Sequence, residues 1–80
     1  MIAIGCDHGG FELAVKIIKH FEENGIEYKN FGTFDGGSVD YPDIALPLAK
    51  SVANGECERG ILVCGTGIGM SIAANKVKGI

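Results

Sequence analysis

Short apolar runs alternate along the chain with stretches in which apolar residues recur at helical spacing. The first run, Ile2–Cys6, is continuous and stops at a turn, which is typical of a buried parallel strand. Over residues 11–21 the apolar positions form a helical stripe, which Asn24 and Gly25 then end. The pattern therefore predicts a strand followed by a helix.

The same alternation continues to the end of the chain. A glycine- and aspartate-rich segment at 32–40 is predicted as a loop, and the turn at 65–69 contains three alternating glycines. The other predicted elements are a polar strand at 26–31, a helix at 42–54, the most apolar strand at 60–64 and a helix at 70–77.

Three strands that alternate with three helices predict a parallel sheet with right-handed crossovers. We expect a single α/β domain over residues 1–80, a three-layer Rossmann-like sheet with the flavodoxin-like strand order 2-1-3. In such sheets ligands bind beyond the carboxyl ends of the strands. The segments 6–10 and 64–69 follow neighbouring strands in this order, so we expect the two to meet there.

Composition narrows the class of protein and its partners. The chain has 80 residues, of which 46% are hydrophobic and 21% charged, a globular rather than a disordered composition. A net charge of −3 without a basic stripe disfavours nucleic acid and anionic membrane surfaces as partners. No apolar run approaches the roughly 20 residues of a membrane span, and no signal peptide is apparent, so we expect a cytoplasmic protein.

The three cysteines, Cys6, Cys57 and Cys64, form neither an even set nor a close pair. They predict no disulfide framework and no metal site. Cys57 is flanked by charged residues and is expected in an exposed turn. Cys6 and Cys64 each end an apolar run, where a cysteine commonly serves as a small buried hydrophobe.

The glycine-rich turn at 65–69 precedes a predicted helix. A turn of this kind presents backbone N–H groups at the positive helix end and binds anions without any side chain. The alternative is a tight turn without function, although one glycine would be enough for that. The spacing departs from the dinucleotide fingerprint and from the Walker pattern, which disfavours a nucleotide.

Cys64 immediately precedes this turn. The helix dipole and nearby amides stabilise a thiolate at such a position, which suits a general base. The same amides can hold an oxygen on which negative charge develops. The residues are therefore compatible with removal of a proton next to a carbonyl group, or with a merely packed cysteine.

Three further side chains are expected near this end of the sheet. Asp7 and His8 follow the first strand, where they could bind sugar hydroxyls and phosphate; the alternative is a helix N-cap beside a surface histidine. Tyr41 lies at the entry of the second helix and could reach the same site or pack in the core.

Together these motifs resemble the type B ribose-5-phosphate isomerases, a family that also includes galactose-6-phosphate isomerase subunits. The resemblance rests on the order and spacing of the segments 5–8, 31–33, 40–42, 60–69 and 71–76, and it covers essentially all 80 residues.

The resemblance implies a metal-free and cofactor-free interconversion of ribose 5-phosphate and ribulose 5-phosphate through an enediolate. It implies that Cys64 is the base and that the Thr66 hydroxyl takes part in ring opening. It further implies a homodimer or a higher homo-oligomer. The implied substrate-binding side chains are those of Asp7, His8 and Tyr41. The resemblance also implies that the backbone of Gly65, Thr66, Gly67, Ile68 and Gly69 binds the developing negative charge.

One branch of the family has a glutamate in this loop in place of the cysteine. That position is Met70 here, so the resemblance is to the cysteine branch. The resemblance implies that family chains continue beyond the equivalent of Ile80 with a His-Asn pair and phosphate-binding arginines. We therefore expect an N-terminal portion of the isomerase that lacks these groups, which puts its activity in this form in question. The one arginine of this chain, Arg59, is expected at the end of the sheet opposite to the predicted site.

Three alternative functions stay open at this stage. Galactose 6-phosphate or allose 6-phosphate would be the substrate in a related isomerase. A small phosphate-binding or assembly module would use the glycine turn without catalysis. A flavodoxin-like carrier would hold a coloured or ultraviolet-absorbing cofactor, which we do not expect.

Overall fold

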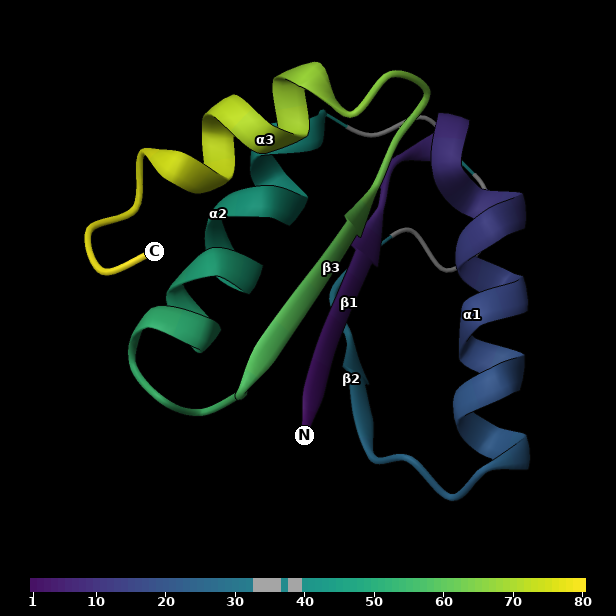
Figure 1. The fold of residues 1–80 in the computed structure, drawn as a ribbon. Helices are drawn as coiled ribbons and strands as arrows, with labels where there is room; N and C mark the ends of the chain where they lie inside the picture. The colour runs from purple at the N-terminus through teal and green to yellow at the C-terminus, as the bar shows by residue number, and fades with distance from the viewer. Residues whose placement is uncertain (33–36, 38–39) are drawn as a thin grey trace.

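A computed structural model describes residues 1–32, 37 and 40–80 of the chain (Figure 1). Three parallel strands form one sheet in the order β2-β1-β3, so the predicted class and strand order are confirmed. The strands are β1 (Ile2–Cys6), β2 (Tyr28–Asn30) and β3 (Arg59–Val63), and the helices are η1 (His8–Gly10), α1 (Phe11–Glu23), α2 (Tyr41–Ala53) and α3 (Ile68–Asn75).

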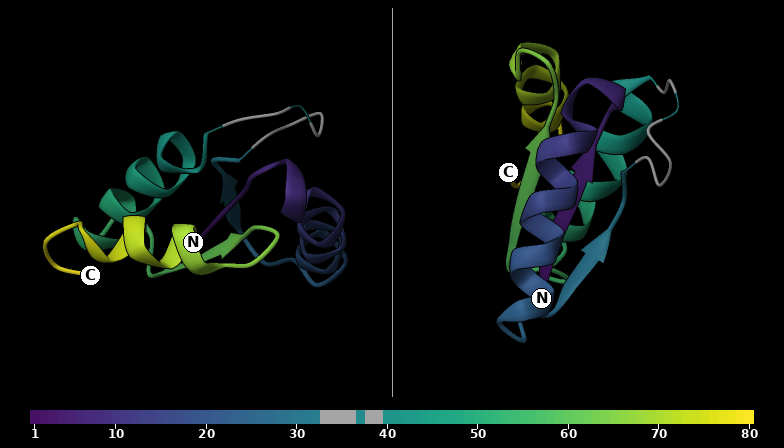
Figure 2. Two further views of the ribbon diagram at one scale, coloured as in Figure 1. Left: turned by 90° about the horizontal axis from the view of Figure 1, so that it is seen from above. Right: turned by 90° about the vertical axis from the view of Figure 1, so that its right-hand side faces the viewer.

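Helices cover both faces of this sheet, which gives three layers (Figure 2). On one face, Ile4 and Cys6 of β1 pack against α1, whose buried residues are Ala14 and Phe21. On the other face, Ala3 packs with residues of α2, because successive strand residues point to opposite sides. Both faces of β1 are buried, which explains why its sequence is a continuous apolar run.

A second set of apolar contacts joins α2 and α3 on the same side of the sheet. Ile44 and Ala45 of α2 and Met70 and Ala73 of α3 form one buried cluster, to which Leu62 of β3 adds its side chain. The first turn of α3 is therefore fixed against α2 as well as against the strand that precedes it. This contact sets the position of the glycine-rich turn.

The carboxyl ends of β1 and β3 lie directly side by side. Their register pairs Cys6 with Val63, and the Asp7 N–H donates to the Val63 carbonyl oxygen at 3.2 Å. Any β-carbon on Gly10 would overlap that same carbonyl group. The turn after β1 is thus pressed against the end of β3, which places Asp7 beside Cys64.

Several boundaries differ from those predicted. The second strand is shorter than 26–31, the second helix begins at Tyr41 rather than Pro42, and the third helix begins at Ile68 rather than Met70 and ends at Asn75. Gly67, with φ +79°, is the N-cap of α3, so the helix starts directly after it. The predicted loop 32–40 includes residues 33–36 and 38–39, which lie outside the described residues.

The predicted exposure of Cys57 is wrong. Only 1% of the residue is exposed, and it packs with Ala3 and Leu48 in the layer beneath α2. Its backbone N–H donates to the Ser51 carbonyl oxygen at 2.9 Å, which draws the turn under the helix. The charged neighbours suggested a solvated turn, but Glu56 points outward while the thiol points inward.

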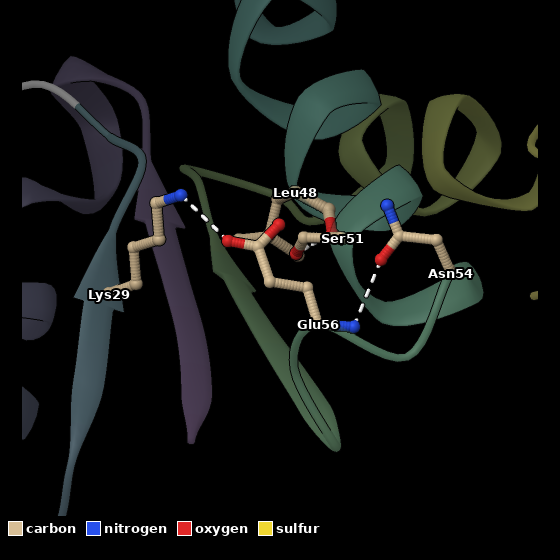
Figure 3. A network of polar contacts seen from close by, with 5 residues as sticks. All are labelled: Lys29, Leu48, Ser51, Asn54 and Glu56. Atoms are coloured by element: carbon tan, nitrogen blue, oxygen red, sulfur yellow. Dashed lines mark hydrogen bonds and ion pairs between the residues drawn. The ribbon is translucent and has the colours of Figure 1, made fainter.

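A polar network surrounds this turn (Figure 3). Glu56 accepts a hydrogen bond from Lys29 of β2 at 2.8 Å, and its backbone N–H donates to the Asn54 side-chain oxygen at 2.9 Å. The buried Ser51 hydroxyl donates to the Leu48 carbonyl oxygen at 2.7 Å, so this polar group is satisfied within α2. In the described part of the chain, no helix has the length and apolar character needed to cross a bilayer.

Candidate active site

A cavity of about 300 Å³ lies at the carboxyl ends of β1 and β3. This is the end of the sheet at which ligands were predicted to bind. The residues that line it come from the turns after both strands and from the starts of α2 and α3. They are Asp7, His8, Gly9, Tyr41, Cys64, Gly65, Thr66, Gly69 and Met70.

Cys64 is half-buried directly after β3, and a backbone group points at its sulfur. The Gly67 N–H donates to Cys64 Sγ at 2.7 Å. Gly67 can turn its N–H back toward the sulfur because its φ of +79° lies in the left-handed region, which favours glycine. The sulfur therefore lies at the start of α3, within hydrogen-bond distance of a backbone donor.

The first turn of α3 offers further N–H groups. Ile68 donates to the Thr66 hydroxyl oxygen at 3.3 Å, and Ser71 makes the first backbone bond into the helix, to the Gly67 carbonyl at 3.0 Å. Among the described residues, the N–H groups of Gly69 and Met70 have no acceptor. The positive end of α3 is therefore available to an oxyanion beside the sulfur.

Asp7 has the capping role that was the alternative to substrate binding, and it also lines the cavity. Its Oδ1 accepts hydrogen bonds from the N–H groups of Gly9, at 2.9 Å, and Gly10, at 3.1 Å. The second carboxylate oxygen has no partner among the described residues. His8 is exposed in η1 and lines the cavity beside Asp7.

Tyr41 is the first residue of α2 and is 42% exposed. This exposure excludes the core-packing alternative, and the ring forms part of the cavity wall. The other tyrosine, Tyr28, packs against Phe21 in the α1 layer, with ring centroids 5.8 Å apart. Only one of the two tyrosines therefore reaches the candidate site.

Two predicted site residues do not line the cavity. Ile68 is 65% exposed, and Gly67 contributes its N–H to the Cys64 sulfur. Two residues that do line it were missed in the sequence. Gly9 approaches the Gly65 nitrogen so closely that an added β-carbon would lie 3.1 Å from it, and Met70 is buried below the turn.

The signals for these two residues were weak. A pair of adjacent glycines at 9 and 10 indicates close backbone approach, although it does not say to what. Met70 is simply an apolar position of α3, and only its place in the first turn brings it to the cavity.

The charges around the cavity are few. Of the described residues that line it, none is lysine or arginine, and none of the described residues forms a cluster that could hold a metal ion. Arg59 begins β3, at the opposite end of the strand from Cys64, as predicted. Polar groups at the cavity are therefore a thiol, a carboxylate, an imidazole, a phenol, a hydroxyl and backbone amides.

Comparison with known proteins gives consistent matches over the whole chain. A family model described as Ribose/Galactose Isomerase matches residues 2–80. Ribose-5-phosphate isomerase B of Escherichia coli is 52% identical over 79 residues, which cover 99% of this chain and 53% of that protein. A galactose-6-phosphate isomerase subunit of Clostridium acetobutylicum is 41% identical over 80 residues, or 100% of this chain and 46% of that protein.

A solved structure of Clostridium thermocellum ribose-5-phosphate isomerase B superimposes with a TM-score of 0.93 at 54% identity. The match covers 99% of this chain and 53% of that one. The chain spans about half the length of the curated relatives it matches.

Proposed function

The chain belongs to the ribose/galactose isomerase family, and from that premise we propose that it acts on ribose 5-phosphate as an aldose–ketose isomerase. The observation that carries the proposal is the Cys64 sulfur, which accepts the Gly67 N–H at 2.7 Å inside the cavity. A sulfur that can act as a base, next to helix N–H groups that have no acceptor among the described residues, is an arrangement suited to proton transfer beside a carbonyl.

The proposed reaction moves one hydrogen between two carbons of the open-chain sugar. The Cys64 thiolate removes the proton from C2, the C–H electrons form a C1=C2 double bond, and the carbonyl electrons move to O1. The enediolate then takes the proton back at C1, while the hydroxyl on C2 loses its proton and becomes the new carbonyl. O1 gains one proton and the hydroxyl on C2 loses one, so the number of protons is unchanged and no oxidant or reductant is needed.

The other cavity residues are assigned to binding and to ring opening. The developing charge on O1 is placed at the N–H groups of the turn 65–69 and the first turn of α3. The Thr66 hydroxyl takes part in ring opening, since it lies in the cavity next to Cys64. Asp7, His8 and Tyr41 bind the sugar hydroxyls and phosphate. The reaction in this proposal uses neither metal nor cofactor.

A second candidate substrate is galactose 6-phosphate, with allose 6-phosphate as a related possibility. The 41% identity to a galactose-6-phosphate isomerase subunit over the full chain favours it. Ribose 5-phosphate and galactose 6-phosphate differ by one carbon. The ratio of kcat/KM for the pentose phosphate to kcat/KM for the hexose phosphate therefore distinguishes the two proposals. A ratio well above one supports the first proposal, and a ratio well below one supports the second.

A non-catalytic phosphate-binding module is the third candidate, because helix N–H groups such as those of α3 that have no acceptor among the described residues can bind an anion without any base. Replacement of Cys64 by serine separates it from an enzyme. In an enzyme this change abolishes turnover and leaves anion binding nearly unchanged. Association as a homodimer or higher homo-oligomer and a cytoplasmic location stay predictions.

The deciding experiment is proton NMR of the 80-residue chain with ribose 5-phosphate in D2O. We expect deuterium to enter at C2 and ribulose 5-phosphate to form, and both signals to be lost in Cys64→Ala. Cys57→Ala is the matched control, because that thiol is buried outside the cavity and its loss leaves the site intact.

Exchange that continues unchanged in Cys64→Ala would contradict the assignment of the base. A folded wild-type chain with neither exchange nor conversion would show that these residues do not suffice for the reaction, and it would leave the family assignment intact.

A further inference from the structure

Gly69 occupies a helical position at which its own backbone does not require glycine. It is the second residue of α3, and its φ lies outside the left-handed region that Gly67 adopts. At ordinary helical positions alanine is favoured over glycine, because glycine loses more conformational freedom. The physical reason for a glycine at position 69 must therefore lie outside the helix.

That reason is the ring of Tyr41. A β-carbon on Gly69 would lie 2.9 Å from Cζ, 3.0 Å from Cε2 and 3.2 Å from Cε1 of the ring. These three atoms form the hydroxyl-bearing end of the side chain, so the phenol lies across the Gly69 backbone. Carbon atoms in ordinary contact stay about 3.5 Å apart or more, so even one methyl group would displace the ring.

The contact joins two elements that are far apart in the sequence and lie at the cavity together. Tyr41 begins α2, Gly69 lies in the first turn of α3, and both line the cavity. Tyr41 as a residue is 42% exposed, so its ring can swing away from a new side chain without disturbing the packed core. Crowding at position 69 would therefore change the cavity wall while leaving the fold nearly as stable.

We propose that Gly69 is a positioning residue for Tyr41, an inference that rests on the isomerase function proposed above. Because Gly69 has no side chain, the phenol of Tyr41 can lie at the wall of the cavity, where it contacts the sugar. Gly69 and Tyr41 thus act as one unit. The N–H of Gly69 is a separate contribution, and alanine at this position would retain it.

The structural part of the test needs no activity. The chain has two tyrosines and no tryptophan, so the ring resonances of Tyr41 and Tyr28 can be followed separately by NMR. In Gly69→Ala we expect the Tyr41 resonances to shift and those of Tyr28, in the α1 layer, to stay in place. A folded Gly69→Ala chain with unchanged Tyr41 resonances would overturn the proposal.

The functional part is a double-mutant cycle on kcat/KM for ribose 5-phosphate. We expect Gly69→Ala to lower kcat/KM by about 10- to 100-fold in the wild-type background, since a displaced contact group costs a factor of this order. In the Tyr41→Ala background the same change should have no further effect, because there is no ring left to displace. An equal loss in both backgrounds would show that Gly69 acts independently of Tyr41.

Gly65→Ala is the matched control for this cycle. Gly65 lies in the turn before Gly69 and lines the same cavity, but an added β-carbon there would meet no atom of residues 1–32, 37 and 40–80 within 4 Å. Its effect should therefore be the same with and without the Tyr41 ring. A wild-type chain without turnover would count against the isomerase function alone, and the tyrosine resonances would still decide the positioning role.

Discussion

The two turns that follow β1 and β3 have related sequences and opposite properties. Each joins a strand to a helix with closely spaced glycines, and each presents N–H groups at the same end of the sheet. After β1, the Asp7 carboxylate occupies those N–H groups. After β3, the Cys64 sulfur accepts the Gly67 N–H, while the N–H groups of Gly69 and Met70 have no acceptor within the described part of the chain.

The glycines of the two turns also differ in purpose. Gly10 is required because the turn after β1 packs directly on the backbone of Val63. At Gly65 and Gly67 an added β-carbon would have no atom of the described residues within 4 Å, so the turn after β3 is open toward the cavity. The first turn is a filled and packed support, while the second is open and has N–H groups without an acceptor among the described residues.

The largest expected effect is on the packed turn. Gly10→Ala forces a β-carbon into the Val63 carbonyl group, and neither backbone can move without breaking the pairing of β1 with β3. We expect a loss of about 3 kcal/mol in the free energy of unfolding, measured by urea denaturation. Gly65→Ala, the control in the open turn, should change it by less than about 1 kcal/mol. Equal losses in the two variants would contradict the distinction between a packed and an open turn.

A smaller loss is expected at Gly67, where conformation rather than space is limiting. Its φ of +79° costs a residue with a β-carbon about 1–2 kcal/mol. Gly67→Ala should therefore lower the free energy of unfolding by that amount. It should also slow alkylation of Cys64 by iodoacetamide, because the N–H that donates to the sulfur is displaced.

The alkylation rate of Gly65→Ala provides the comparison for that measurement. This variant should react at nearly the wild-type rate. An unchanged rate in Gly67→Ala would mean that its N–H does not assist the sulfur.

At the filled turn, Asp7→Ala removes the acceptor for two N–H groups. The expected loss of stability is about 1 kcal/mol, the usual effect of losing an N-terminal cap. Asp7→Asn retains a side-chain oxygen as acceptor, so its loss of folding stability, measured by thermal unfolding, should be less than half that of Asp7→Ala. If the alanine variant were as stable as wild type, the turn would not depend on its own carboxylate.

The smallest effect lies at neither turn and shows how little an exposed ion pair contributes. The hydrogen bond from Lys29 to Glu56, together with the charge of Glu56, raises the pKa of Lys29. Because the folded-state pKa is the higher one, the stabilisation is complete below the unfolded pKa of about 10.4 and is lost as the pH rises through the folded value.

The melting temperature of Lys29→Met should thus lie slightly below that of wild type at pH 8. The difference should vanish at strongly alkaline pH. Lys76→Met is the control, since Lys76 has no ion pair among the described residues. A difference that grows with pH would contradict the sign of the pKa shift.

Much of the fold could be predicted because it follows from local periodicity. The apolar run at 2–6, the helical stripe at 11–21 and the strand near 60–64 each stand out in the sequence, and the order of elements implies parallel strands. The short strand β2 was placed correctly but overextended, since Ile26 and Tyr28 look alike in a pattern of apolar positions. The start of α3 depended on the conformation of Gly67, which the sequence does not state.

The candidate site was predictable to the extent that strand ends reveal it. Cys64 and Asp7 each follow a strand, so the predicted strand order was enough to bring them together. Gly9 and Met70 were missed because neither carries a group that signals binding. Cys57 was misplaced because flanking charges outweighed its own apolar character in the pattern, whereas packing against Ala3 decided its position.

The sequence by itself therefore determined the order of strands and helices, the class of the sheet and the end at which a ligand could bind. These follow from residue spacing, since the periods of strands and helices are local properties of the backbone. Only the tertiary structure decided which N–H groups are occupied, that the Gly67 N–H reaches the Cys64 sulfur, and that Tyr41 lies across Gly69. Such contacts form only when two groups are placed to within a few tenths of an ångström, and many of these groups lie on segments far apart in the chain. No local pattern in the sequence encodes that placement.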